Sequence, residues 1–126
     1  MGKIKSFTDL LVWQEGHKLV IFIYEITKSF PKEETYSLTD QMRRSATSFT
    51  SNVAEGFGRS TYKDKTSFYY RAQGSLIELK NQILIARDVR YLSEEQFENL
   101  MNQANQSHRL LQGLIQKSKE FISKLE

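Results

Sequence analysis

Hydrophobic residues recur along most of the chain at intervals of three, four or seven, the spacing that keeps side chains on one face of an α-helix. The first such segment is expected to begin near Thr8, a capping residue that is followed by Asp9 in the first turn. Pro31 ends it, because the residue before a proline avoids helical dihedral angles. The apolar face of this predicted helix carries Val12, Leu19, Ile23, Ile26 and Phe30.

The second helical segment is expected to begin near Ser37, where Ser-Leu-Thr-Asp at positions 37 to 40 resembles a capping box. Gly56 and Gly58 follow, and glycine is the usual residue where a helix ends in left-handed dihedral angles. We therefore expect these two glycines to close the helix. Its predicted core residues are Leu38, Met42, Phe49 and Val53.

The third segment begins near Thr61, with Asp64 three residues further on. One apolar face carries Phe68, Ala72, Leu76, Leu79, Ile83 and Ala86. A second row, spaced by sevens, consists of Tyr70, Ile77, Leu84 and Tyr91. Because one neighbouring helix cannot cover so wide an apolar surface, this is predicted to be either the central helix of the bundle or a helix buried in an oligomer interface. The second row supplies the candidate interface residues.

The fourth segment opens with the capping box Ser93-Glu-Glu-Gln96. Its apolar residues continue with heptad-like spacing to Leu125. Four helices joined by short connections favour antiparallel neighbours. The sequence therefore predicts an all-α protein, an antiparallel up-down four-helix bundle forming one domain over residues 1–126, with helices at roughly 9–29, 38–56, 62–90 and 94–124.

Five segments stand out as motifs: Phe7-x-x-Leu10-x-Val12-Trp13, Phe30-Pro31-x-Glu33, Gln41-x-Arg43-Arg44, Ser51-Asn52-Val53-Ala54-Glu55-Gly56-x-x-Arg59 and Gly74-Ser75-Leu76-x-Glu78-Leu79. Together they resemble the four-helix protein family encoded in intervening sequences of bacterial 23S ribosomal RNA genes, which is related to the accessory variability protein of diversity-generating retroelements. Phe49 departs from the family pattern, which favours a smaller aliphatic residue there, and Gly16 stands in place of an alanine. The resemblance implies a bundle that assembles as a ring, commonly a homopentamer, with a link to nucleic acid and no enzymatic activity.

Composition narrows the function classes. The chain contains no cysteine, which excludes thiolate catalysis, cysteine-ligated zinc and disulfides. Its most apolar run, residues 19–24, is too short to span a bilayer, and no run of signal-peptide length follows the first lysines. We therefore expect a cytoplasmic protein. The net charge of +3 is only mildly basic and says little about partners.

The positive charge is concentrated between residues 41 and 71. Six cationic residues against two acidic ones give this segment a net charge of +4, more than that of the whole chain. Arginine makes bidentate contacts with phosphate, and nearby tyrosines can stack on unpaired bases. The alternative is a solvated face with intramolecular ion pairs. The candidate nucleic-acid-binding residues are Arg43, Arg44, Arg59, Lys63, Lys65 and Arg71.

A polar stripe follows one face of the second predicted helix at spacings of three and four. It is interpreted as a hydrogen-bonded structural network inside or between subunits, and the alternative is a ligand or nucleic-acid surface. Its members are Gln41, Ser45, Ser48, Asn52 and Glu55, with Arg59 at the end and Arg44 beside them.

Other chemistry finds little support in the sequence. The two histidines, His17 and His108, have no neighbouring cluster of ligating residues, so no metal and no cofactor are expected. His17 is expected to be partly buried and hydrogen-bonded, and Trp13 to anchor the core. Gly74-Ser75 is interpreted as a close helix crossing, because a catalytic serine would also need a base and an oxyanion hole.

The sequence thus favours a non-catalytic, homo-oligomeric helical scaffold that binds structured RNA or DNA through a basic surface. The alternative is a protein–protein adaptor, with a reverse transcriptase or a ribosome-associated protein as its partner. A small enzyme would require a deep pocket joining Glu55, Arg44 and His17. No membrane partner is expected.

Overall fold

The computed structural model describes residues 3–125, and these form an all-α fold. Four long helices dominate it: α1 (Leu11–Thr27), α2 (Leu38–Phe57), α3 (Tyr62–Asp88) and α4 (Glu94–Leu125). Two short 3-10 helices precede the first two of them, η1 (Phe7–Asp9) and η2 (Lys32–Glu34). Within residues 3–125, no helix has both the length and the apolar character needed to cross a membrane.

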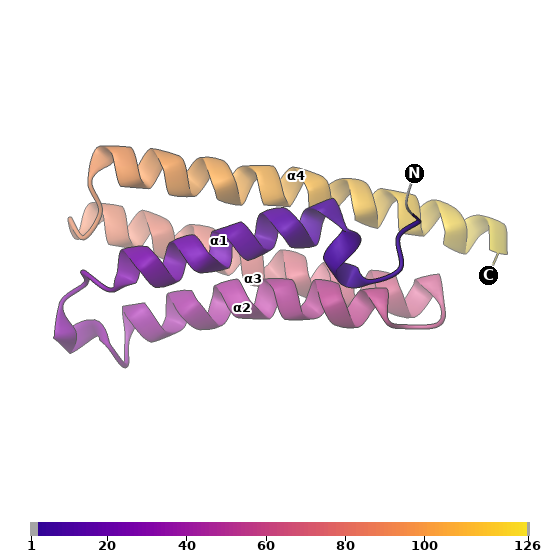
Figure 1. The fold of residues 1–126 in the computed structure, drawn as a ribbon, viewed down its shortest axis with the longest axis horizontal. Coiled ribbons are helices and arrows are strands. Elements are labelled where there is room, and N and C mark those ends of the chain that lie inside the picture. The colour runs from indigo at the N-terminus through magenta and orange to yellow at the C-terminus, as the bar shows by residue number, and fades with distance from the viewer. Residues whose placement is uncertain (1–2, 126) are drawn as a thin grey trace.

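The long helices lie side by side along the long axis of the molecule, and successive connections lie at alternate ends (Figure 1). Each helix packs on two others, in the pairs α1–α2, α2–α3, α3–α4 and α1–α4. The expectation that the third helix is central is therefore wrong as far as residues 3–125 are concerned, because α3 contacts only α2 and α4. Its second apolar row faces outward.

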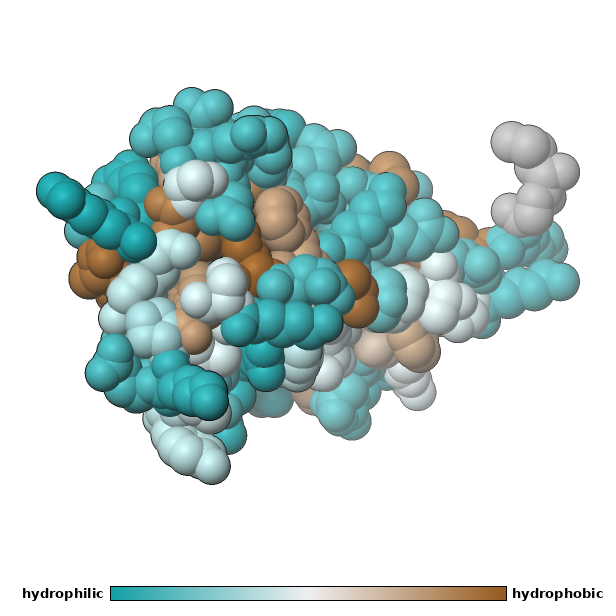
Figure 2. All heavy atoms as spheres, turned by 60° about the vertical axis from the view of Figure 1, so that its left-hand side comes forward, coloured by the Kyte–Doolittle hydropathy of each residue, from teal (hydrophilic) through white to brown (hydrophobic). Residues whose placement is uncertain are grey.

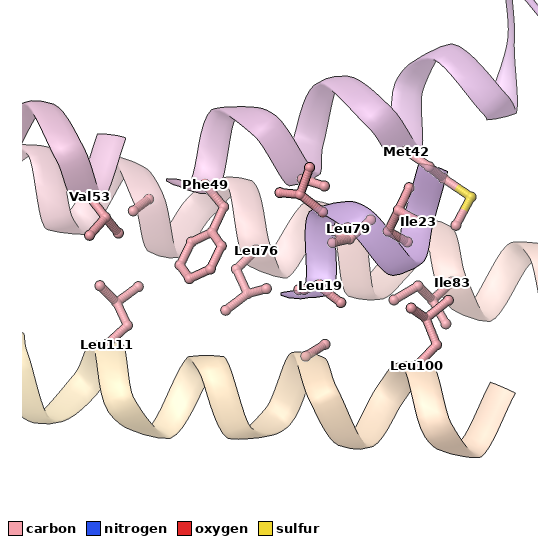
Figure 3. Packing of buried hydrophobic residues seen from close by; sticks show 14 of the residues in the cluster. Leu19, Ile23, Met42, Phe49, Val53, Leu76, Leu79, Ile83, Leu100 and Leu111 are labelled. Carbon is pink, nitrogen blue, oxygen red and sulfur yellow. The ribbon is translucent and has the colours of Figure 1, made fainter. Parts of the chain in front are cut away.

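The core runs along the middle of the bundle, with side chains from all four helices pointing toward one another (Figure 3). Leu19 of α1, Leu76 of α3 and Leu111 of α4 are completely buried. Burial of one such side chain contributes about 1.5–3 kcal/mol relative to leaving it exposed. Periodic apolar positions therefore account for the bundle.

One fit in this core explains two departures from the family pattern. Gly16 of α1 lies against Phe49 of α2, and a Cβ atom added at Gly16 would lie 2.5 Å from Cε2 of the Phe49 ring. The phenylalanine, which is fully buried, thus occupies the space that an alanine side chain would need. The absence of a side chain on α1 and the larger side chain on α2 compensate each other.

The start of the first helix differs from the prediction. Ser6, rather than Thr8, is the capping residue: its hydroxyl accepts from the Thr8 N–H, and Asp9 reaches back to the Ser6 N–H. This capping box closes the separate 3-10 helix η1. The chain then turns at Leu10, whose backbone is extended, and α1 begins only at Leu11.

The ends of α2 also differ from the prediction. Ser37 makes no side-chain capping bond, and the carboxylate of Glu34 accepts from the Leu38 N–H instead. Gly58 has right-handed helical angles, so it does not provide a left-handed cap. Gly56 has a different role: an added Cβ would lie 2.6 Å from the Tyr69 ring, so a glycine lets α3 approach closely.

The remaining helix ends follow the expected chemistry more closely. Thr61 caps α3 by accepting from the Asp64 N–H, and Ser93 and Gln96 form the predicted capping box of α4. α3 ends at Asp88, two residues earlier than predicted. There Arg90 takes the left-handed conformation, with φ of 69°, that a helix-terminating residue adopts and that glycine usually provides.

The surface is mostly polar. Charged and polar side chains cover most of the face in Figure 2, with apolar side chains showing between them. The exposed apolar residues of α3 and its end are Tyr70, Ile77, Leu84, Ile85 and Val89, and those of α1 are Leu11, Ile21 and Tyr24.

Candidate nucleic-acid interface

Two arginines each contact the same aromatic ring beside the connection between α2 and α3. Arg59 follows α2, and Arg71 lies on α3 one turn after Phe68. Their guanidinium carbons are 4.4 Å and 4.7 Å from the centroid of the Phe68 ring. The ring therefore holds both cations at the surface. A guanidinium stacked in this way keeps its in-plane N–H donors available for an anion.

Arg59 has one acidic ion-pair partner among the described residues, Glu55. Its carboxylate lies 3.7 Å from Arg59, one helical turn away, and both side chains are about half exposed. An exposed pair of this kind is screened by salt and contributes little to stability. Arg71 makes no ion pair with any residue between 3 and 125, so the positive charge of the pair is only partly compensated.

Lys63 and Lys65 diverge, although both lie in the first turn of α3. Lys63 is exposed, whereas Lys65 is half-buried and donates to the carbonyl oxygen of Phe57 at 2.5 Å. Burial lowers the pKa of the Lys65 ammonium. Lys65 is therefore not an exposed cation like Lys63, because its side chain joins the end of α2 to α3.

Arg43 also makes its contacts within the fold. Its Nε donates to the Thr27 hydroxyl at 2.9 Å, and its guanidinium carbon lies 4.7 Å from the centroid of the Tyr24 ring. It thus fastens α2 to α1. Arg44 is exposed but lies in the N-terminal half of α2, away from the α2–α3 connection. Of the six predicted basic residues, only Arg59, Lys63 and Arg71 gather at one end as exposed cations.

The polar stripe of α2 faces α3 over its middle part. Ser45 donates to the Glu78 carboxylate at 2.8 Å, and the hydroxyls of Ser48 and Ser75 lie 2.9 Å apart. Asn52 donates to the Ser48 carbonyl oxygen at 2.9 Å. Gln41 and Glu55, at the two ends of the stripe, are exposed. The central three residues form a network within the subunit.

The four candidate oligomer-interface residues also differ in their environments. Tyr70, Ile77 and Leu84 are 45%, 52% and 37% exposed along one side of α3. Tyr91 does not continue this row, because it lies beyond α3 and its hydroxyl donates to the Glu34 carboxylate at 2.8 Å. That bond lowers the pKa of the Glu34 carboxyl. The outward row thus consists of three residues.

Three further expectations change. His17 is exposed, where it stacks on Trp13 with ring centroids 4.8 Å apart, so the prediction of a partly buried histidine is wrong. Trp13 itself is half-buried against the edge of the core. Gly74 is exposed and nothing lies within 4 Å of an added Cβ, so the close approach of α2 and α3 at this pair is made by Ser75, whose hydroxyl lies 2.9 Å from that of Ser48.

The residue that the sequence did not single out is Phe68. It was assigned to the core, whereas it is half-buried and supports both arginines. The available signal was its spacing, since an arginine three residues along a helix lies on the same face as the aromatic ring. The contact with Arg59 required the fold, because that residue follows another helix.

Comparisons with known proteins agree with this fold. A family model described as 23S rRNA-intervening sequence protein matches residues 8–113. A crystal structure of a protein of unknown function from the S23 ribosomal protein family of Bacteroides thetaiotaomicron is similar, with a TM-score of 0.78. The two chains are 20% identical, and the similarity covers 84% of this chain and 96% of the other. A search of the curated proteins found no match.

Proposed function

Because the chain belongs to the 23S rRNA-intervening sequence protein family, we propose that it is a non-catalytic helical scaffold that binds structured RNA or DNA. In this proposal the four helices form an antiparallel, up-down bundle that assembles as a homo-oligomeric ring in the cytoplasm. The basic surface at the α2–α3 connection contacts phosphate groups. Repetition of that surface around the ring adds weak contacts together by multivalency.

The observation that carries the proposal is the pair of guanidinium groups over Phe68. Arg59 and Arg71 are exposed and contact the same ring, and among residues 3–125 their only ion-pair partner is the Glu55 carboxylate, which pairs with Arg59. Stacking restricts both side chains before any ligand arrives, which reduces the entropy that binding must offset. Such a pair is suited to phosphate oxygens, which guanidinium groups contact in bidentate geometry.

Charge reversal tests this surface. We expect Arg59→Glu/Lys63→Glu to abolish binding of a structured RNA hairpin and a DNA duplex at physiological salt, measured by fluorescence anisotropy. For the unchanged protein, the logarithm of affinity should fall linearly with the logarithm of salt concentration, with a slope of about 0.9 for each phosphate neutralised on a B-form duplex. Circular dichroism of the variant should show an unchanged helical fold.

A matched control has the same change in net charge at the opposite end of the bundle. Lys28 ends α1 and Lys32 begins η2, and both are exposed. The Lys28→Glu/Lys32→Glu variant should therefore lose much less affinity than the Arg59/Lys63 variant. Equal losses of affinity in the two variants would show that binding depends only on the net charge of the protein. Unchanged affinity in both variants would contradict the assignment of the basic surface as the binding site.

The proposed ring has two apolar surfaces to support it. α3 exposes Tyr70, Ile77 and Leu84 at intervals of seven residues. The backbones of α1 and α3 are not adjacent within residues 3–125, and α1 exposes Ile21 and Tyr24. A head-to-tail ring joins two different surfaces of neighbouring subunits, whereas a two-fold dimer uses the same surface twice. Five subunits is the number that the family resemblance implies.

Light scattering after size-exclusion chromatography measures the assembly directly. The protein should have a mass that is a multiple of 14.8 kDa. Ile77→Glu should release subunits, because a charge in the middle of the α3 row would have to be buried at the interface. Lys119→Glu, an exposed change on α4, should leave the mass unaltered. A 14.8 kDa monomer at micromolar concentration would contradict the ring.

The same exposed row on α3 favours a second candidate function, that of a protein–protein adaptor. In that case a reverse transcriptase or a ribosome-associated protein would contact the bundle with no nucleic acid between them. Association that persists after nuclease treatment and is lost with Ile77→Glu, but not with Arg59→Glu/Lys63→Glu, would favour the adaptor over the nucleic-acid scaffold.

A further inference from the structure

A largely apolar cavity of about 280 Å³ lies beside the α2–α3 connection. The N-terminal segment, the end of α2, the start of α3 and the C-terminal part of α4 all contribute to it. The rings of Tyr62 and Phe121 stack on each other in its wall, with centroids 4.7 Å apart. Leu10, Phe57 and Leu114 supply further apolar surface.

Two lysines, Lys65 of α3 and Lys117 of α4, also line this cavity, and no acidic residue lines it with them. Lys65 is half-buried and contacts the Phe57 carbonyl oxygen. Neither lysine forms an ion pair with any residue of the described chain, 3–125. A cation that has lost part of its hydration and faces no carboxylate is stabilised by an added anion.

The pKa of Lys65 agrees with this uncompensated charge. Burial lowers it, and no neighbouring carboxylate acts in the opposite direction. In an ordinary buried ion pair, the partner acid would raise the pKa of the lysine. The cavity therefore combines an apolar wall with a positive charge that no residue between 3 and 125 pairs with.

We propose that this cavity binds a small organic anion, whose apolar body packs against Leu114 and Phe57 while its charged head group lies between Lys65 and Lys117. The volume limits the body to a short alkyl chain or a single ring system. Two sources share this chemistry. One is a free amphipathic carboxylate, and the other is an unpaired nucleotide of a nucleic acid held at the neighbouring Arg59 and Lys63. The first source does not depend on the proposed function.

The head group is tested with three ligands of equal chain length. Titration calorimetry should detect saturable binding of octanoate to the full chain, at one site per subunit. Octylamine, which has a positive head group, should not bind at that site, and octanol should bind about tenfold more weakly than octanoate, the loss expected for one charge-assisted hydrogen bond. Octanol binding as tightly as octanoate, or no saturable octanoate binding, would overturn the proposal.

Four variants test where octanoate binds. Lys117→Gln should weaken octanoate binding about tenfold, and because Lys117 is exposed, this variant should keep its fold. Lys119→Gln removes the same charge two residues away, outside the cavity, and should bind octanoate normally. Leu114→Trp should block binding by filling the cavity. Because Lys65 also holds the end of α2, Lys65→Gln is informative only with its unfolding midpoint measured beside it. Unchanged octanoate affinity in both Lys117→Gln and Leu114→Trp would overturn the assignment.

Competition distinguishes the two sources. Adenosine monophosphate that displaces octanoate would identify the ligand as an unpaired nucleotide, and RNA with an unpaired loop should then compete better than a perfect duplex. A free carboxylate is identified if neither competes. Octanoate binding that persists in Arg59→Glu/Lys63→Glu, when nucleic-acid binding is lost, would separate this cavity from the basic surface, so that failure of one proposal leaves the other to be judged alone.

Discussion

The Gly16–Phe49 contact and the Lys80–His108 contact are two places where the bundle interior departs from simple apolar packing. The first, between α1 and α2, is a matter of shape, since a ring occupies the space above a residue without a side chain. The second, between α3 and α4, is a matter of charge, since the Lys80 ammonium lies 2.6 Å from Nδ1 of the His108 ring. The two contacts should therefore respond to different perturbations.

The charged contact is also the less well satisfied of the two. Nε2 of His108 is buried without a hydrogen-bond partner among the described residues, and the same holds for the side-chain oxygens of Gln82 and Ser107. All three residues belong to α3 or α4. Burial first, and then the charge of Lys80, lower the pKa of His108. Volume should therefore govern stability at α1–α2, and protonation should govern it at α3–α4.

The largest expected effect is that of Phe49→Ala. This ring is fully buried, so its removal should lower the free energy of unfolding by about 3–5 kcal/mol. Urea denaturation followed by circular dichroism measures the change. The loss should be the same at neutral and mildly acidic pH, because the contact contains no titratable group. A loss that varies with pH would break the proposed contrast.

Gly16→Ala should have the next largest effect, about 1–3 kcal/mol of destabilisation, because the new Cβ atom meets the Phe49 ring at 2.5 Å. In a Phe49→Leu background the same substitution should cost much less, since a leucine can give way. In a double-mutant cycle, the double variant should therefore be less destabilised than the sum of the two single variants. Additive effects would show that the glycine serves some purpose other than making room for the ring.

The smallest expected effect is a dependence of stability on pH that arises at His108. Because its pKa is lowered in the folded protein, the unfolded chain takes up the proton at a higher pH than the folded one. The contribution is complete above the ordinary histidine pKa near 6.5 and is lost as the pH falls below it toward the folded value. The free energy of unfolding should thus decline as the pH falls below about 6.5.

His108→Gln isolates this effect, because carboxyl groups that titrate over the same range are present in both proteins. The difference in stability between the unchanged protein and the variant should change with pH through the histidine range. Lys80→Gln should reduce the decline without removing it, since burial is the larger cause of the lowered pKa. Parallel pH profiles for the unchanged protein and His108→Gln would exclude this residue as the origin.

The four helices were predictable because their signals are local. Thr61 and Ser93 cap their helices as the sequence suggested, each through an N–H three residues away. Ser37 failed as a cap because the Glu34 carboxylate, from the preceding 3-10 helix, accepts from the Leu38 N–H instead. The existence of a helix follows from the periodicity of its apolar residues. The capping of its end depends on which of several nearby acceptors bonds to its free N–H groups in the fold.

The basic surface was harder to predict, because a sequence does not show where a charged side chain points in the fold. Arg43 and Arg44 are adjacent in the chain, yet the first bonds to Thr27 of α1 and the second is exposed. Similarly, the departure at Phe49 was visible in the sequence, but only the fold brings it against Gly16. These side-chain environments depend on contacts between helices, which cannot be inferred from residue spacing within one helix.

The length of α4 gives the molecule a built-in gradient of local opening. It has 32 residues, against 20 in α2, and its C-terminal turns extend past the end of the other helices (Figure 1). Amide hydrogens near Leu100 can exchange with solvent only when the core opens, whereas those of the last turn need only fraying of the helix end. Exchange rates along this single helix should therefore rise from its buried centre to its tip.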